Sequence, residues 1–351
     1  MSSASEYMVG PMIGQGGFSH VVYAVHKHSE RKVAIKVIEQ VSLRRHPWLL
    51  QAVMTEKKIL QQASKTTTKD TQSQSTSWIV ELWAAFYDEQ QMYLVLELCS
   101  GGDLEGLLLQ VFGNENESAE DSTERNTRRK AWFEHSLHYY ASQLLQAVNY
   151  LHTEKRVLHC DLKPGNCLLD ADTGHLKLAD FASAIDMATQ GQNCSDDSII
   201  PRGTCEYSCL EIIRANSPSS LSEAVDYWSV GCVLHAMSNN GKSPFSRESE
   251  ASTIQAVAGF CTAPNTLLGQ SFEEQSTSRA EWMEMGAQLL QPKPQVRIRA
   301  WTEVVIKNEA TKVGHSADIS NVVLPKPSWQ TQLDSAALKD GSAGWATFQS
   351  F

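Results

Sequence analysis

The chain has 351 residues, of which 42% are hydrophobic, and a formal net charge of −10. This length accommodates one large domain or two modest ones, and the hydrophobic fraction supports a packed core, which excludes a disordered polyanion. The acidic balance and the lack of a Lys/Arg-rich stripe argue against nucleic acid as a partner and remain compatible with a basic protein substrate.

The cysteine pattern and the hydropathy indicate where the protein resides. The eight cysteines are scattered without paired spacing and form no Cys-x-x-Cys knuckle, which indicates reduced thiols. No run approaches the roughly 18 apolar residues of a membrane span, and the N-terminus has no signal-peptide pattern. We therefore expect an intracellular protein with no membrane span, located in the cytoplasm or the nucleus.

The first 98 residues have the pattern of strands around one helix. Alternating apolar positions predict strands over residues 7–13, 21–25, 32–39, 79–87 and 91–98. Apolar residues at helical spacing predict a helix over 47–62, and the Ser/Thr/Gln/Lys-rich stretch 63–77 predicts a loop insertion.

The remainder of the chain has mainly helical patterns. Gly101 and Gly102 mark a linker, and the polar tract 113–130 predicts a solvated surface loop. An apolar stripe over 137–151 predicts a helix, and the nearly continuous apolar run 226–237 predicts a buried central one. The signal weakens beyond residue 300, and the last residues, 316–351, have the composition of a tail.

Residues 159–169 carry the residue types that phosphoryl transfer needs. Asp161, Lys163 and Asn166 lie on one tight loop, followed by a short apolar strand, and a second carboxylate, Asp180, precedes Phe181. The reaction requires a carboxylate for a hydroxyl proton, a cation for the moving phosphate and oxygen ligands for a metal. The two motifs together predict a phosphotransferase.

This pair of motifs resembles the catalytic and metal-binding loops of eukaryotic serine/threonine protein kinases. The resemblance covers about residues 7–306. It implies the two-lobed α+β protein kinase fold, with an N-terminal antiparallel β-sheet lobe carrying one helix and a mainly helical C-terminal lobe. On this basis we expect an N-lobe at residues 1–98, a C-lobe at 99–306 and a C-terminal tail at 307–351.

A glycine-rich hairpin precedes the strand that carries Lys36. By resemblance, the backbone around Gly14, Gly16 and Phe18 approaches the phosphates of ATP, because glycine has no side chain to obstruct them. The resemblance also implies that Lys36 binds the non-transferred phosphates and pairs with Glu56 on the following helix.

Residues 94–104 resemble the strand and hinge that bind adenine in this family. The resemblance implies that Leu96 lies beside the adenine and that backbone groups of Glu97 and Cys99 bond its edge. Asp103 is expected to take the ribose hydroxyls. Apolar contacts to both faces of the base are expected from Val21, Ala34 and Leu168.

The resemblance also assigns the chemical roles. Asp161 is expected to accept the substrate hydroxyl proton, and Lys163 to neutralise charge on the transferring γ-phosphate. Thr204 is expected to bond to both, as in the serine/threonine branch. Asn166 and Asp180 are expected to hold Mg²⁺, which prefers oxygen ligands. The implied cofactors are ATP and Mg²⁺ and the implied partner is a protein substrate; no sequence signal identifies a regulatory partner.

Two positions depart from the family pattern. Ala182 replaces the glycine that usually follows the Asp-Phe pair, which narrows the backbone angles there. Cys160 replaces the arginine that usually precedes the catalytic aspartate, and a thiol cannot receive a phosphorylated activation-loop residue. Since residues 200–202 also lack a Ser or Thr, we expect activity that is independent of activation-loop phosphorylation.

Within the family, the spacing of the N-lobe helix, the hinge and the terminal pair Phe348 and Phe351 resemble the AGC group, and residues 34–60 resemble phosphoinositide-dependent kinase in particular. In that group a similar pair docks beside the N-lobe helix. A disordered end is the first expectation for terminal residues, and docking of this pair is the alternative. The resemblance further implies a buried ion pair between Glu211 and Arg297.

We therefore expect a serine/threonine protein kinase that uses Mg-ATP. The alternative is a pseudokinase acting as a nucleotide-binding or allosteric scaffold, which Cys160, Ala182 and the degraded motif at residues 209–211 favour; a small-molecule kinase is a third class. Phosphorylation of a generic basic protein, compared with an Asp161→Asn variant, separates the first two. Turnover on an alcohol or amine without peptide phosphorylation would identify the third.

Overall fold

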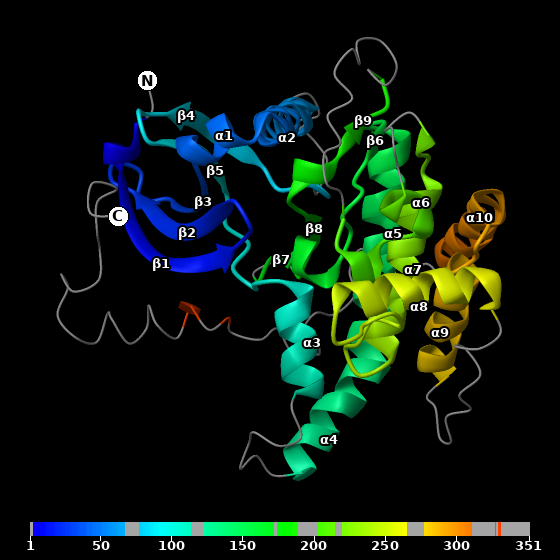
Figure 1. Cartoon of the computed structure of the whole chain (residues 1–351). Coiled ribbons are helices and arrows are strands. Elements are labelled where there is room, and N and C mark those ends of the chain that lie inside the picture. Colours follow the sequence, from blue (N-terminus) through cyan, green and yellow to red (C-terminus); the bar gives the residue numbers. More distant parts are fainter. Residues whose placement is uncertain are drawn as a thin grey trace.

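The computed structural model describes residues 3–66, 77–113, 122–171, 174–188, 203–214, 220–264, 277–310, 327 and 329–330. Figure 1 shows a strand-rich N-terminal lobe beside a larger, mainly helical C-terminal lobe. The two-lobed α+β fold expected from the sequence is therefore confirmed.

The N-terminal lobe is built on a five-stranded antiparallel sheet with the order β1-β2-β3-β5-β4. The central strands are the most apolar because both of their faces are covered, and in β3 every residue between its two ends is buried. The strands are β1 (Tyr7–Gln15), β2 (Ser19–His26), β3 (Lys32–Glu39), β4 (Leu82–Tyr87) and β5 (Gln91–Glu97).

Two helices connect β3 to β4. The short α1 (Gln40–Arg45) has no counterpart in the sequence prediction, whereas α2 (Pro47–Thr66) is the predicted helix. The helix α2 extends into the stretch expected to be a loop insertion, because Ala63 is buried in the core and the Ser64 hydroxyl donates to the Leu60 carbonyl. The expected insertion is thus wrong for residues 63–66.

The C-terminal lobe is organised around α5 (Leu137–Thr153) and α7 (Ala224–Ser238). Nearly every residue of α7 is buried, as the continuous apolar run predicts for a helix without a solvent face. Further helices of this lobe are α3 (Leu104–Phe112), α4 (Ser122–Ala131), α6 (Leu210–Ile213), α8 (Glu250–Thr262), α9 (Thr277–Leu289) and α10 (Pro294–Ala310).

The polar tract 113–130 was expected to be a surface loop, and this expectation is wrong for its second half, which forms α4 (Ser122–Ala131); residues 114–121 lie outside the described residues. The acidic first turn and basic last turn of α4 complement the helix dipole. The guanidinium groups of Arg128 and Arg129 donate to the carbonyls of Gln110 and Phe112 at the end of α3. These tertiary contacts favour a helix that an apolar pattern alone does not reveal.

Two small antiparallel ribbons carry the loops between the lobes, β6 (Val157–Leu158) with β9 (Ile185–Asp186) and β7 (Cys167–Leu169) with β8 (Leu176–Leu178). The hinge after β5 lies directly on β7, because the amide of Gly101 donates to the Leu169 carbonyl over 2.8 Å. A Cβ at residue 101 would lie only 2.8 Å from that carbonyl oxygen, so the contact requires glycine.

A short part of the C-terminal tail is described, and it contacts both the hinge and the N-terminal lobe. Pro327 lies beside Gly102, and the buried Trp329 packs against Tyr23 of β2 with ring centroids 5.6 Å apart. Phe348 and Phe351 lie outside the described residues. Within the described part of the chain, no helix combines the length and the apolar character needed to cross a membrane.

Candidate active site

The Asp226 carboxylate, near the start of α7, anchors the backbone of the loop between β6 and β7. One carboxylate oxygen accepts from His152 Nε2 at 2.7 Å and from the His159 amide at 2.8 Å, and the other accepts from the Cys160 amide at 2.8 Å. Asp226 is 0% exposed. Burial works to raise the pKa of Asp226, but the bonds and charge from His152 and His159 outweigh it and lower the pKa.

His159 links this anchor to the segment that carries the second carboxylate. Its Nε2 lies 3.0 Å from the Ala179 carbonyl, which can only accept, so Nε2 carries the proton. Its Nδ1 accepts the Asp161 amide, and its ring packs on Phe181 with centroids 4.8 Å apart. The His159 side chain therefore links the loop that carries Asp161 to the segment that carries Asp180 and Phe181.

Asp161, Lys163 and Thr204 form a hydrogen-bonded triangle. The Thr204 hydroxyl donates to Asp161 Oδ1 at 2.9 Å and accepts from Lys163 Nζ at 2.9 Å. Lys163 Nζ also lies 3.4 Å from Asp161 Oδ2. The contact that the sequence predicted for Thr204 is present, although 41 residues separate it from Lys163.

Gly203 brings Thr204 to the catalytic loop. Its φ of +79° lies in the left-handed region, and a Cβ there would collide with the Ser208 hydroxyl and lie 3.1 Å from the Cys160 carbonyl oxygen. The close approach of the two loops therefore depends on glycine at this position.

A second charged cluster joins β3, α2 and the segment after β8. Lys36 Nζ lies 2.9 and 2.8 Å from the two oxygens of Glu56 and 2.8 Å from Asp180 Oδ1. The Phe181 amide also hydrogen-bonds to Glu56. Lys36 and Glu56 are buried, whereas the Asp180 side chain is 44% exposed.

The charged groups in this cluster shift each other's pKa values. The positive charge of Lys36 lowers the pKa of Asp180 to about 2, although burial opposes it. Burial works to lower the pKa of Lys36, but Asp180 and Glu56 outweigh it and raise the pKa. Both groups are thus charged at neutral pH.

Asn166 and Asp180 offer a donor set that fits magnesium. The Asn166 amide nitrogen donates to the Asp161 carbonyl at 2.7 Å, which leaves its side-chain oxygen as the ligand atom. Among the described contacts none engages Asp180 Oδ2. Asp180 adopts a left-handed backbone (φ 61°, ψ 75°), a conformation that is uncommon outside glycine and typical of functional sites. Two oxygen ligands of this kind suit a hard cation.

The residues expected to hold the nucleotide come together at the sheet and hinge. Val21 pairs with Lys36 and with Gly14, Ala34 pairs with Leu96, and Leu168 forms a bridge with Asp103. The Glu97 amide already donates to the Glu81 carbonyl, so its own carbonyl is the group that can meet adenine. Gly16 lies at the exposed tip of the hairpin, and Cys99 is buried at the hinge.

Two nucleotide-site candidates make contacts that the sequence did not predict. The Asp103 carboxylate caps α3 by accepting the Gly106 amide at 2.8 Å. The Phe18 ring, 40% exposed, packs edge-on against His46 and Trp48 at the start of α2, with centroids 5.1 and 5.3 Å away. The aromatic residues flanking the predicted helix start were the only sequence signal for this cluster.

The local backbone accommodates Cys160 and Ala182, the two residues that depart from the family pattern. Cys160 is buried, and its backbone at φ 64° is fixed by the bond to Asp226. Ala182 lies in the short 3₁₀ turn Phe181–Ser183 and is not among the residues with positive φ, so this conformation does not require glycine. The expected Glu211–Arg297 pair is present at 2.7 Å, with Arg297 buried.

Glu105 is a site residue that the sequence reasoning missed. A Cβ on Gly165 would lie 2.9 Å from Glu105 Oε2, so the carboxylate fills the space left by the glycine. Burial, together with the nearby charges of Asp103 and Glu206, raises the pKa of Glu105, and Lys163 opposes the rise. The helix α3 therefore supplies a carboxylate, that of Glu105, beside the loop that carries Asp161.

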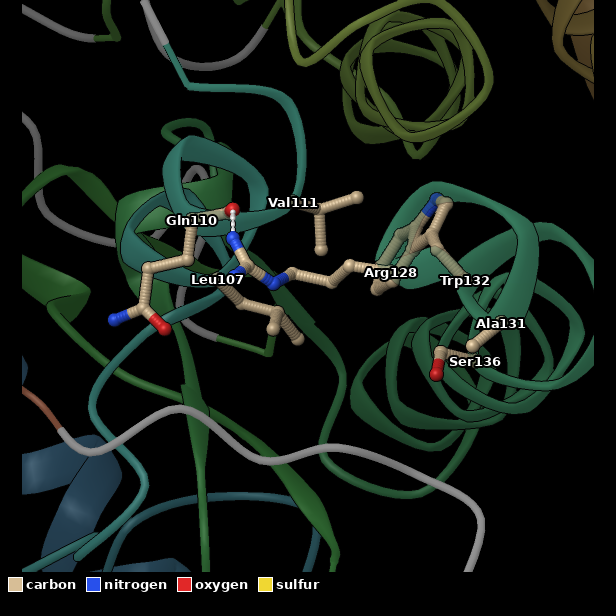
Figure 2. Close-up of a pocket in the computed structure, with 7 residues that line it drawn as sticks. All are labelled: Leu107, Gln110, Val111, Arg128, Ala131, Trp132 and Ser136. Carbon is tan, nitrogen blue, oxygen red and sulfur yellow. Dashed lines mark hydrogen bonds between the residues drawn. The ribbon is translucent and has the colours of Figure 1, made fainter. Parts of the chain in front are cut away.

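A small cavity lies away from this site, between α3 and α4 (Figure 2). It measures about 40 Å³ and its wall includes Leu107, Val111 and Trp132. The Arg128 guanidinium crosses it to reach the Gln110 carbonyl. A cavity of this size holds little more than a water molecule, so it is no candidate for the nucleotide.

The sequence matches the family described as "Protein kinase domain" over residues 7–307. It is 31% identical over 263 residues to Serine/threonine-protein kinase PKH1 of Saccharomyces cerevisiae, covering 72% of this chain and 30% of that protein. It is 31% identical over 262 residues to Citron rho-interacting kinase of Rattus norvegicus, covering 74% of this chain and 11% of the relative. With Rho-associated protein kinase 1 of Oryctolagus cuniculus the identity is 28% over 260 residues, with coverages of 72% and 16%.

The chain thus spans 30% or less of the length of these curated relatives. The relatives are AGC kinases, in agreement with the AGC-like resemblance of the hinge and of residues 34–60.

Proposed function

The chain belongs to the protein kinase family, and on that premise we propose that it is a serine/threonine kinase that transfers the γ-phosphate of Mg-ATP to protein hydroxyls. The observation that carries the proposal is the triangle of Asp161, Lys163 and Thr204, with all three sides within 3.4 Å. A chain that had lost phosphotransfer would have no functional reason to keep a partly buried base, its cation and their shared hydroxyl in one network.

In the proposed reaction the substrate hydroxyl oxygen forms a bond to the γ-phosphorus while the bond from that phosphorus to the ADP oxygen breaks. The hydroxyl proton passes to Asp161, whose orientation is fixed by Thr204. Lys163 contributes positive charge beside the phosphoryl group as it moves. Position and charge, rather than covalent chemistry, are what these residues supply.

Lys36 and Glu56 would orient the phosphates that are not transferred, and Asn166 and Asp180 would hold magnesium. When bound, the metal offsets the negative charge that accumulates on the phosphates. Lys36 Nζ lies 2.8 Å from Asp180 Oδ1, so the cation and the proposed metal ligand meet at one point. Val21, Ala34 and Leu168 would enclose the adenine.

The serine/threonine assignment is supported by Lys163 and Thr204, the pair typical of that branch, and by the similarity to Serine/threonine-protein kinase PKH1. We further propose that activity does not depend on activation-loop phosphorylation. Cys160 provides a buried thiol where a phosphate would need a cation, which supports this independence.

Steady-state phosphorylation of a generic basic protein by purified chain tests the activity. We expect Mg-ATP-dependent transfer that is lost in Asp161→Asn and kept in Glu89→Gln, a control in the turn between β4 and β5. Binding of Mg-ATP without any transfer by the unmodified chain would contradict the proposal and favour a pseudokinase. Turnover on a small alcohol or amine alone would indicate a small-molecule kinase.

Phosphatase treatment tests the independence from activation-loop phosphate. We expect treated and untreated protein to differ less than about twofold in transfer rate, since no charge partner for that phosphate exists at Cys160. A loss of about tenfold or more, restored by rephosphorylating a residue between Thr189 and Thr204, would contradict this part of the proposal.

A further inference from the structure

An ion pair connects the outer part of α2 to the segment that follows the second motif. Lys58 Nζ lies 2.8 Å from Asp186 Oδ2. The side chain of Asp186 is 10% exposed and that of Lys58 is 46% exposed. The pair spans 128 residues of sequence, so it joins the N-terminal lobe to the C-terminal lobe.

Asp186 is fixed relative to the catalytic loop. It ends β9 and pairs across the ribbon with Val157 of β6, the strand that leads into the loop at His159. The Met187 amide donates to the Arg156 carbonyl at 2.8 Å, and the Ala188 amide donates to Asp186 Oδ1 at 3.0 Å. The carboxylate is therefore held by backbone contacts on both sides and is aimed at α2.

On α2, Lys58 lies two residues beyond Glu56. At about 100° per residue, the two side chains leave the helix about 200° apart, on nearly opposite faces. Glu56 ties one face to Lys36 of the sheet, and Lys58 ties the other to Asp186 of the C-terminal lobe. One anchor allows a helix to turn about its axis, whereas two anchors on opposite faces fix its rotation.

We propose that Lys58 and Asp186 are positioning residues, an ion pair that holds α2 in the rotation at which Glu56 reaches Lys36. The anionic partner of α2 is the Asp186 carboxylate of the C-terminal lobe. It is therefore present without any added phosphate. This inference rests on the proposed kinase function and deepens its regulation. It supplies the physical reason why phosphate added to the activation loop is not needed to order α2.

A double-mutant cycle tests the pair with Lys58→Met, Asp186→Asn and the combination of both. Lys57→Met on the same helix is the matched control, and Asp186→Asn keeps an oxygen for the Ala188 amide. Each single variant should lower kcat about fivefold, because a pair with a half-exposed lysine is worth about 1 kcal/mol. The double variant should be no slower than either single one, which marks a shared interaction.

Salt provides a readout that a merely structural residue would not change. Raising the ionic strength from about 0.05 to about 0.5 M should lower kcat of the unmodified chain more than that of Lys58→Met, because screening weakens only an existing pair. Lys58→Arg should retain most of the rate. Equal salt dependence in both proteins, or effects of the two single changes that simply add, would overturn the proposal.

Amide hydrogen exchange measures the anchoring without relying on turnover. We expect exchange in α2 to become at least about threefold faster in Lys58→Met and to stay unchanged in Lys57→Met. Unchanged exchange in α2 would overturn the inference even if the chain transferred phosphate normally. A chain with faster exchange in Lys58→Met but no transfer in any form would instead contradict the kinase function and leave the positioning role supported.

Discussion

Two carboxylates near the catalytic loop differ in how their oxygens are used. Asp226 is fully buried, and its two oxygens accept three hydrogen bonds from His152, His159 and Cys160. Asp180 is about half exposed, and its described contact is with Lys36 through one oxygen. The first carboxylate is saturated by the protein, and the second keeps an oxygen for a ligand.

The difference teaches how the fold separates support from chemistry. A saturated buried carboxylate fixes the backbone of the loop, because moving either amide would leave a charge without partners. A carboxylate that contacts one cation and is partly exposed can bind a metal without breaking the structure. Substitution at the first should therefore affect stability, and substitution at the second should affect ligand binding.

The largest expected effect is on stability, at Asp226. Asp226→Ala leaves the buried groups of His152, His159 and Cys160 without an acceptor, so we expect the free energy of unfolding to fall by about 3–5 kcal/mol. Urea unfolding followed by circular dichroism measures it. Asp180→Asn is the comparison and should change the unfolding free energy by less than about 1 kcal/mol. Equal stability of the two variants would remove the distinction between the carboxylates.

A large effect on catalysis is expected at Lys36. Lys36→Met removes the cation that we propose binds phosphate and that lowers the pKa of Asp180, so we expect phosphate transfer to fall by about 100-fold or more. The melting temperature should fall as well, because the buried Glu56 carboxylate loses its cation. Lys32→Met, on the exposed end of the same strand, is the control. Transfer by Lys36→Met within tenfold of the unmodified chain would argue against this site.

A smaller effect is expected on the pH dependence of folding stability, at a histidine outside the proposed active site. Burial lowers the pKa of His235 on α7 to about 4, whereas in the unfolded chain the value is about 6.5. The unfolded state then binds more protons between these values, so stability falls as the pH drops through this window. We expect up to about 2 kcal/mol of lost stability between pH 7 and pH 5 from this group. In His235→Gln that part of the pH dependence should disappear, and an unchanged pH profile of unfolding would contradict it.

The residues of the proposed site could be singled out from the sequence because they lie in short motifs. Asp161, Lys163 and Asn166 share one loop, and the Lys36–Glu56 pair was implied by the family resemblance. Most strand and helix positions were predicted from apolar periodicity, whereas the fold class was implied by the resemblance. The contact of Thr204 with this loop was predicted from the resemblance alone.

Other features were missed because tertiary contacts create them. The helix α4 has no apolar stripe and is stabilised by guanidinium contacts with the end of α3. The pair of Lys58 and Asp186 joins two common residue types across 128 positions, for which a single sequence carries no pattern. Glu105 occupies a space that exists only because residue 165 is a glycine.

The central claim is that Asp161 and Asp180 do different work in one phosphotransfer site, and paired measurements of Mg-ATP binding and phosphate transfer test it most directly. Asp161→Asn should bind Mg-ATP within about threefold of the unmodified chain and transfer no phosphate, because it loses a base and not a ligand. Asp180→Asn should lose the magnesium-dependent part of nucleotide affinity as well as transfer. Retained transfer in either variant, or identical nucleotide binding in both, would contradict the account.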